Sequence, residues 1–170
     1  MNQFHSHFQQ STEDRRWNRL AITMDSFHQG FRHEYDTIFS MADGSFSNKY
    51  RLSLAEFLRT ATSFRRHLEI HHNIEERYIF PVLAKRMPSF RDNEKHRNSH
   101  HSIHDGLDRL SLLIAKYSED NTKYSPTEFR SCLESFRDVL FAHLDEEVAD
   151  LSGENLKKYW TIDEVDLIVI

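Results

Sequence analysis

The hydrophobic and polar positions of this chain repeat with the period of an α-helix over four long segments. Apolar residues recur three and four positions apart, which places them on one face of a helix. In the last long segment Cys132, Phe136 and Leu140 form such a stripe, and His143 and Glu147 continue it at the same spacing. The pattern predicts helices, and it turns two ionisable side chains of the last one toward the core.

Three turn-rich stretches separate the segments: ADGSFSNKYR at 42–51, MPSF at 87–90 and SEDNTKYS at 118–125. Such clusters of Gly, Pro, Ser, Asn and Asp are typical of loops between helices. The predicted helices therefore span 12–41, 53–86, 90–117 and 126–151. Pro81 lies near the end of the second helix, and a kink is expected there.

Capping residues mark the predicted helix starts. A serine precedes an acid by three positions at Ser53 and Glu56, Ser89 and Asp92, and Ser125 and Glu128. In such a box the serine accepts a hydrogen bond from a free backbone N–H, and the acid reaches back to the cap residue. Thr161 and Glu164 have the same spacing and predict one short helix in the tail.

Short connections make consecutive helices antiparallel neighbours, so the fold class predicted is all-α: an up-down-up-down four-helix bundle. The whole chain, 1–170, is expected to form one domain, with the bundle over about 12–151. The tail, 152–170, is expected to pack over one end of the bundle. The chain has only 4 glycines and 3 prolines, which fits helices better than a strand-rich fold.

The charge distribution excludes several classes of partner. The formal net charge is −5, and acidic and basic residues are interspersed, so neither nucleic acid nor an anionic membrane is an expected partner. No apolar run is long enough for a signal peptide or a membrane span. Cys132 is the only cysteine, which excludes an internal disulfide and cysteine-based zinc motifs. A cytoplasmic protein is expected.

The chain contains 12 histidines, and several have the spacing of metal ligands. Three pairs lie four residues apart, one pair in each of the last three predicted helices: His71 with Glu75, His100 with His104, and His143 with Glu147. His28 is the corresponding residue of the first helix. Each set falls near the middle or inner part of its helix, and in an antiparallel bundle the middles share one height.

Burying seven such groups is costly unless a cation compensates for their lost hydration. Five imidazoles and two carboxylates exceed the four ligands of a tetrahedral zinc site, but they suit two octahedral ions bridged by carboxylates. Two iron ions are the expected cofactor, and the metal ligands predicted are His28, His71, Glu75, His100, His104, His143 and Glu147.

At these residues, within about 17–151, the chain resembles the hemerythrin-like family. That family has a lone histidine in the first helix, His-x-x-x-Glu, His-x-x-x-His, and a last helix with a histidine and a carboxylate. The stretches HHNIEERYIFPVLAKRMP and AHLDEEVADLSGENLKKYW are similar to its fungal single-domain members. The resemblance implies one iron held by His100, His104 and His143, and another held by His28 and His71.

The resemblance also implies that Glu75 and Glu147 bridge the irons beside an oxo or hydroxo group, with an open position for dioxygen on the second iron. One departure stands out. Oxygen-carrying members end in His-x-x-x-x-Asp, whereas this chain has a glutamate at the fourth position after His143, as in the broader cation-binding branch. Reversible oxygen carriage therefore does not follow from the resemblance.

Alternative ligands remain open. His72 and Glu76 have the same spacing as His71 and Glu75; the latter pair is preferred because it matches the family and leaves Ile74 and Tyr78 near the core. His33 could replace His28. His67 and His96 extend the stripes by one turn and could be solvated residues, partners of the ligands or ligands. Phe27, Phe31, Phe64 and Phe136 are expected to pack in the core.

Three functions fit these residues. The first is a non-heme diiron protein that binds or senses dioxygen or a related small molecule. The second is a diiron oxidoreductase that uses oxygen or peroxide on a small organic substrate, and it also needs a substrate cavity. The third is iron storage or buffering, for which neither a cage assembly nor an exit path is evident.

Overall fold

The computed structural model describes residues 12–91 and 95–170, and within them it contains helices and no strand. The all-helical prediction is confirmed. The four long helices are α2 (Arg19–Met41), α4 (Leu54–Ile74), α6 (Lys95–Glu119) and α7 (Pro126–Asp150). The short elements are α1 (Thr12–Trp17), α3 (Ser45–Asn48), the π-helix η1 (Glu75–Ile79), α5 (Phe80–Leu83), the 3₁₀-helices η2 (Pro88–Phe90) and η3 (Asn121–Lys123), α8 (Gly153–Leu156) and α9 (Ile162–Asp166).

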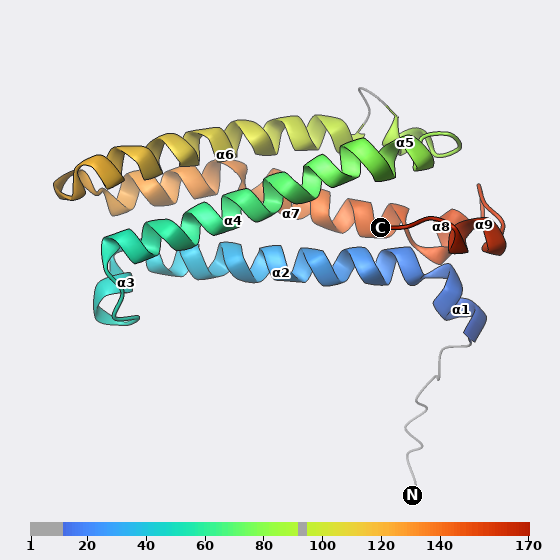
Figure 1. Ribbon diagram of the computed structural model, residues 1–170, viewed down its shortest axis with the longest axis horizontal. Coiled ribbons are helices and arrows are strands. Elements are labelled where there is room, and N and C mark those ends of the chain that lie inside the picture. The colour runs from blue at the N-terminus through green and yellow to red at the C-terminus, as the bar shows by residue number, and fades with distance from the viewer. Residues whose placement is uncertain (1–11, 92–94) are drawn as a thin grey trace, which may run out of the picture.

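The four long helices lie side by side, and the connections between them alternate between the two ends of the molecule (Figure 1). α2 packs against α4 and α7, and α6 packs against the same two helices. The four helices therefore enclose one interior, to which each contributes a face.

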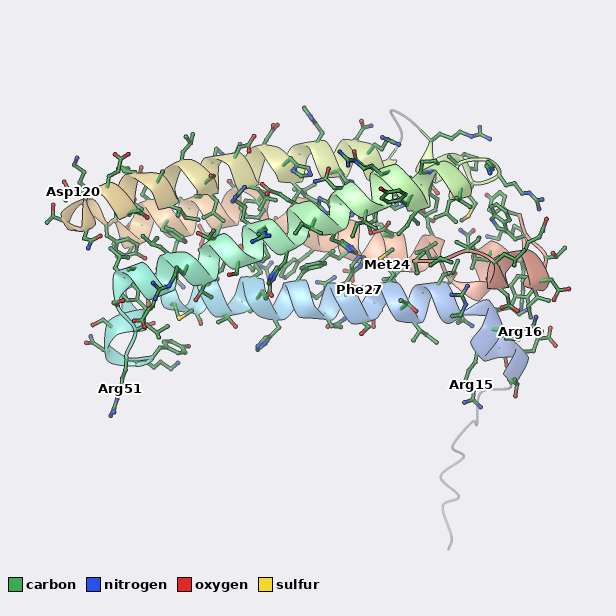
Figure 2. The ribbon with its side chains drawn as sticks, viewed as in Figure 1. Arg15, Arg16, Met24, Phe27, Arg51 and Asp120 are labelled. Atoms are coloured by element: carbon green, nitrogen blue, oxygen red, sulfur yellow. The ribbon has the colours of Figure 1, made fainter. Side chains whose placement is uncertain are left out.

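The first predicted helix is divided at Asn18, between α1 and α2. The Asn18 side-chain amide donates to the backbone oxygen of Asp14, and its oxygen accepts from the Gly153 N–H at 2.9 Å. Arg16 donates to Asp163 and Asp166 of the tail (Figure 2). The tail contains the expected short helix, α9, and a second one, α8, that was not expected; both pack against α1 at this end.

The second predicted helix changes its winding before Pro81. A proline has no N–H to donate to the carbonyl four residues earlier, and its ring clashes with that carbonyl in an α-helix. The chain widens into η1, where the Phe80 N–H bonds to Glu75 O, five residues earlier. The disturbance expected at Pro81 is therefore a π-helical turn that begins at Glu75, a form often found at functional sites.

Two capping boxes have both of their predicted hydrogen bonds. Ser53 Oγ accepts from the Glu56 N–H, and the Glu56 carboxylate accepts from the Ser53 N–H at 2.8 Å. Thr161 and Glu164 form the same pair of bonds at the start of α9. These predictions are confirmed.

The other two boxes differ from expectation. Ser125 accepts from the Glu128 N–H, but the Glu128 carboxylate accepts from Lys116 and Tyr117 instead of reaching back. The third predicted helix does not begin at position 90, because Arg91 has an extended backbone. Asp92, the predicted acid of that cap, lies outside the described residues.

The apolar core consists of two clusters. The larger one lies toward α3 and η3 and includes Tyr35, Phe64 and Phe136, while the smaller one lies toward α1 and the tail and includes Leu20 and Leu83. Ionisable side chains that are almost fully buried lie between the clusters along the sequence of every long helix: His28, His72, Glu75, His96, His100, His143 and Glu147. We call these residues, together with the half-buried His71, the polar layer.

Gly106 allows α6 and α7 to approach closely, so Gly106→Ala is expected to lower the free energy of unfolding. A Cβ there would lie 2.5 Å from the Phe136 ring, and overpacking of this kind costs about 1–3 kcal/mol. Gly30→Ala in α2 is the control, because no atom lies within 4 Å of its added Cβ. In urea unfolding, the Gly30→Ala control should be more stable than the wild type by about 0.5–1 kcal/mol. A stabilised Gly106→Ala variant would contradict the close packing.

Candidate metal centre

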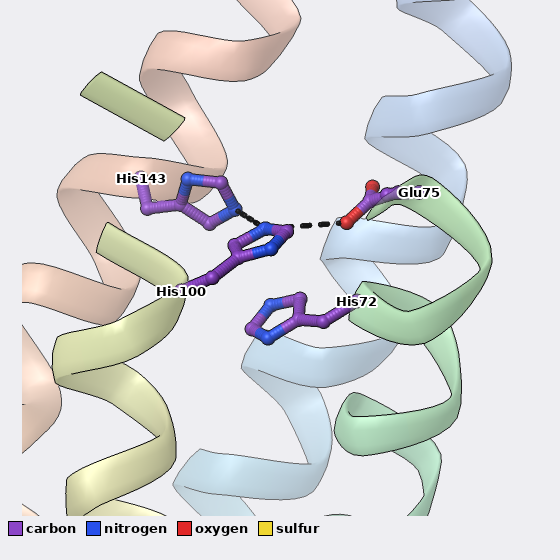
Figure 3. A group of neighbouring side chains, drawn as sticks. All are labelled: His72, Glu75, His100 and His143. Carbon is purple, nitrogen blue, oxygen red and sulfur yellow. Dashed lines mark hydrogen bonds and ion pairs between the residues drawn. The ribbon is translucent and has the colours of Figure 1, made fainter. Parts of the chain in front are cut away.

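The polar layer contains two groups of metal-ligating side chains. In each group one ligand atom per residue lies within 4.8 Å of the others. One group comprises His72, Glu75, His100 and His143 (Figure 3), and the other comprises His28, His71, Glu75 and Glu147. Six of the seven predicted ligands are brought together in these groups, and Glu75 belongs to both.

The end of α4 supplies residues to both groups because successive helical residues point about 100° apart. His71 points toward α2, where its Nε2 lies 3.3 Å from His28 Nε2. His72 points toward α6, where its ring stacks on His100 with 3.8 Å between the ring centroids. Glu75, one turn later, has its oxygens 2.9 Å from His71 Nε2 and 3.4 Å from His100 Nε2.

The sequence-based preference for His71 over His72 treated the two as alternatives, whereas the structure places both in the layer. The same preference put Ile74 and Tyr78 near the core, which was wrong. Their exposed fractions are 46% and 68%.

His104, a predicted ligand, lies outside both groups. Its half-buried ring is edge-on to His72, with 5.3 Å between the centroids. His33 is exposed, and His67 is an exposed partner of Glu34. His96 is buried and bonds to Asp150 at 2.9 Å, so it adjoins the groups without joining either of them.

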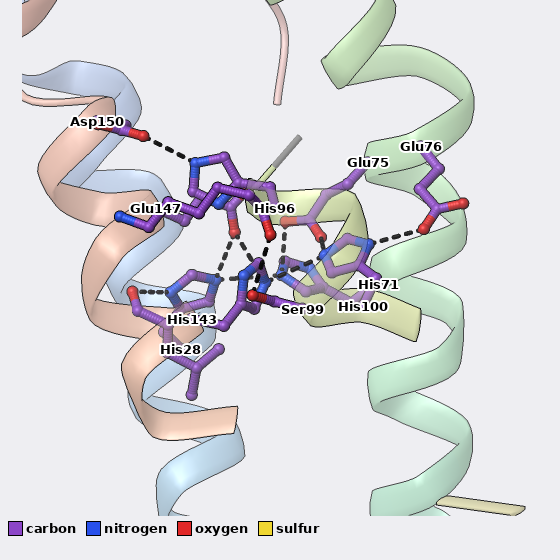
Figure 4. A network of polar contacts seen from close by, with 12 residues as sticks. His28, His71, Glu75, Glu76, His96, Ser99, His100, His143, Glu147 and Asp150 are labelled. Carbon is purple, nitrogen blue, oxygen red and sulfur yellow. Dashed lines mark hydrogen bonds and ion pairs between the residues drawn. The ribbon is translucent and has the colours of Figure 1, made fainter. Parts of the chain in front are cut away.

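Two imidazoles are held so that Nε2 faces the groups. His28 Nδ1 donates to the Leu144 carbonyl at 2.9 Å, and His100 Nδ1 donates to Glu76 Oε1 at 2.8 Å (Figure 4). A hydrogen bond of this kind fixes the tautomer and leaves Nε2 as the ligand atom. Glu76 belongs to neither group, and it therefore acts by orienting His100.

Burial keeps three of the imidazoles neutral. It lowers the pKa of His28 to about 4 and holds the pKa of His72 and His143 well below the usual value. The neutral ring is the form that binds a metal ion. By contrast, the pKa of His100 is raised: burial opposes protonation, but the Glu75 and Glu76 carboxylates outweigh it.

The two buried carboxylates differ in their acidity. Burial and the neighbouring charge of Glu75 raise the pKa of Glu147 well above its usual value. Burial acts in the same direction on Glu75, but the close ring nitrogens of His100 and His71 hold its pKa well below the usual value. Without a cation, the carboxylate pair therefore favours one proton and one negative charge.

Several polar atoms of the layer have no hydrogen-bond partner. They are both ring nitrogens of His72, Nδ1 of His96 and of His143, and both oxygens of Glu75 and of Glu147. The imidazoles nearest the Glu75 oxygens lack the alignment of hydrogen bonds. Buried polar atoms are normally satisfied, and imidazole nitrogens and carboxylate oxygens are ligands of first-row metals. The residues present thus fit metal ions.

The model of the hemerythrin HHE cation-binding domain matches residues 20–152, which include both groups. The chain belongs to this family. The hemerythrin HHE domain binds metal cations, and the polar layer of this chain contains two groups of side chains that could hold them. The sequence resemblance is confirmed.

A curated relative of this HHE chain is the "Dimeric xanthone biosynthesis cluster protein R11" of Cryptosporiopsis sp. (strain 8999). It is 31% identical over 100 residues, which cover 55% of this chain and 37% of the relative. The match thus spans little more than a third of the relative's length. No solved structure matches the chain. Among the described residues, no helix has the length and apolar character required to cross a membrane.

A cavity of about 510 Å³ lies beside the polar layer, between α2 and α4. His71 lines it, together with apolar side chains that include Met24 and Phe27 (Figure 2). Phe27 has 52% of its surface exposed, so the prediction that it packs in the core was wrong. The sequence pattern carried no signal for the cavity, because apolar residues around a cavity and around a filled core have the same spacing.

Proposed function

We propose that this chain binds two iron ions in the polar layer of an up-down-up-down bundle and reacts there with dioxygen or a related small molecule. The observation that carries the proposal is the pair of overlapping groups, whose buried ligand atoms include several without hydrogen-bond partners. Nitrogen and carboxylate donors in this number suit octahedral iron better than tetrahedral zinc.

Each ion would have its own imidazoles and would share carboxylates with the other. His28 and His71 would hold one ion, and His72, His100 and His143 the other, with Glu75 common to both. Glu147 Oε2 lies 3.5 Å from His28 Nε2 and 3.6 Å from His143 Nε2, which supports a second bridge. The bound ions would supply redox chemistry toward oxygen, while burial keeps His28, His72 and His143 neutral and hydrogen bonds orient His28 and His100.

His72 takes the place that the sequence gave to His104, and two variants separate them. His72→Ala is expected to lose one ion per chain, because its ring is fully buried within the group. His104→Ala is expected to keep both ions, because it removes a half-buried ring outside the groups. Metal analysis after reconstitution with ferrous iron measures the difference. Loss of an ion from His104→Ala alone would restore the original prediction.

The function itself is tested by loading the metal-free chain with ferrous iron without oxygen, then admitting air while recording the charge-transfer spectrum. Two irons per chain and a spectral change on exposure to air are expected. A long-lived oxygenated form that reverses under vacuum would identify carriage or sensing. One zinc per chain, with no uptake of iron, would contradict the diiron proposal.

A second candidate function is oxygen-dependent oxidation of a small organic compound. The cavity at His71 favours it, because carriage of dioxygen alone does not need about 510 Å³ beside the metal ligands. The relative's place in a dimeric xanthone biosynthesis cluster is also consistent with an enzyme. Conversion to the oxidised spectrum should then accelerate when an organic substrate is added, whereas a carrier or sensor would not respond.

A further inference from the structure

The cavity between α2 and α4 has walls that soluble proteins usually bury. Phe27, Ile70 and Ile74 line it, and each of these large apolar side chains has about half of its surface exposed: 52%, 46% and 46%. Exposed apolar groups gathered around a hollow are typical of a ligand site. At this place the walls favour a mainly apolar ligand.

Gly30 lies in the middle of α2 and lines the same cavity. A glycine weakens the interior of a helix, and it is normally explained by a close neighbour or by a positive φ. Neither applies to Gly30, because no atom lies within 4 Å of a Cβ built on it and its φ is not positive. The missing side chain serves to keep the cavity open.

One part of the cavity wall is polar. Glu34 lines the cavity, and its Oε1 bonds to Nδ1 of His67 at 2.9 Å. The other oxygen, Oε2, is buried and has no hydrogen-bond partner. A buried carboxylate oxygen without a donor is costly. Because the Glu34 side chain as a whole is only half-buried, a rotation of its carboxylate would bring this oxygen to a ligand hydroxyl, which would supply the donor.

Another part of the wall is His71, whose ring contacts Phe31 with 4.8 Å between the centroids. The Nε2 atom of His71 points to Glu75 and His28 in the polar layer. His71 therefore separates the cavity from the metal ligands by a single ring. A molecule in the cavity would lie next to the proposed iron of the second group.

The geometry points to a binding site in this cavity for an aromatic molecule that carries a hydroxyl group. Its rings pack against Phe27 and the isoleucines, its hydroxyl donates to Glu34, and one edge faces His71. This inference rests on the proposed function, because it names the class of organic compound that the diiron site would act on. The volume is within the range of small-molecule sites, which favours this occupant over a second copy of the chain.

The test is titration of the full iron-loaded chain, without oxygen, with 2-naphthol, followed by the intrinsic fluorescence of the probe. Saturable binding of one probe per chain is expected. Gly30→Leu, which fills the cavity, should weaken binding by about tenfold or more. Gln29→Leu is the matched control, because it adds the same side chain at the next position of α2 outside the cavity lining, and it should stay within about twofold.

A second variant tests the polar contact. Glu34→Gln should weaken 2-naphthol several-fold and leave naphthalene, which has no hydroxyl, unchanged. Equal binding of 2-naphthol to the wild type, Gly30→Leu and Glu34→Gln would overturn the assignment. So would sedimentation showing that the wild type self-associates and that Gly30→Leu abolishes this, because a second copy would then occupy the groove.

Metal analysis of the same samples separates the two proposals. Two irons in Gly30→Leu, together with lost probe binding, would support both the site and the diiron centre. Probe binding that depends on Gly30 in a chain with no iron would support the cavity as a binding site and contradict the proposed function. Two irons with no probe binding in the wild type would contradict the cavity assignment alone.

Discussion

Replacing Glu75 with glutamine is expected to remove both metal ions. Glu75 is the residue that the two groups share, and its oxygens lie 2.9 Å from His71 Nε2 and 3.4 Å from His100 Nε2. Glutamine keeps the shape but removes the negative charge that would face both cations. Losing only a residue that orients a ligand costs about 10–100-fold in metal affinity, so losing a shared ligand should cost at least about a hundredfold at each site.

Two neighbouring acids provide graded controls for Glu75→Gln. Glu76→Gln should weaken only the ion near His100, by about tenfold, because Glu76 orients that ring. Glu69→Gln, a part-buried partner of Arg65 on α4, should retain both ions. Titration with ferrous iron, with circular dichroism to check folding, measures all three. Two tightly bound ions in a folded Glu75→Gln protein would refute a shared site.

Acidifying the metal-free protein from pH 7 to pH 5 is expected to destabilise it. The pKa values of His28, His72 and His143 are lower in the folded state, so the unfolded chain takes up protons that the folded chain excludes. Their stabilisation is complete above about pH 6.5 and is lost as the pH falls toward the folded value, about 4 for His28. For His28 alone this amounts to about 3 kcal/mol.

Two groups oppose this trend. The raised pKa values of His100 and Glu147 mean that the folded state holds their protons more tightly, so they stabilise it as the pH falls. Below about pH 6.5 His100 is protonated in both states, so toward pH 5 the three imidazoles oppose Glu147 alone and leave a net slope of about two protons, or about 2.7 kcal/mol per pH unit. Urea unfolding at pH 7, 6 and 5 measures this slope, and His28→Gln should remove about half of it. A stability that rises toward pH 5 would contradict the buried neutral imidazoles.

Much of the fold could be predicted from local patterns. These patterns, such as the stripe through Phe136 and Leu140 and the cap at Ser53, depend on residues close together in sequence. Each of the four predicted helices overlaps one of the long helices α2, α4, α6 and α7. What failed depended on distant contacts. Glu128 could not be predicted to turn toward Lys116, and the break at Asn18 reflects its bond to Gly153 of the tail.

The candidate site, like the fold, could be predicted where it depends on local spacing. Six of the seven predicted residues lie in the groups: five belong to pairs spaced by four, which share one helix face, and the sixth is the lone His28. One exception is His104 of α6, and the other is His72 at the end of α4, where His71 and His72 diverge around the helix axis. Which of two adjacent histidines faces the interior depends on how far α4 is rotated between α2 and α6. A single helix pattern does not contain that rotation.

The position of the polar layer between two apolar clusters has a consequence for how the molecule unfolds. Apolar contacts can make each end a cooperative unit, but the metal-free layer between them contains buried polar atoms without hydrogen-bond partners, which do little to couple the unfolding of the two ends. Cations bound by all four long helices at once would couple the two ends, so that they unfold together. Bound iron would then determine whether the protein unfolds in one cooperative transition, in addition to supplying its chemistry.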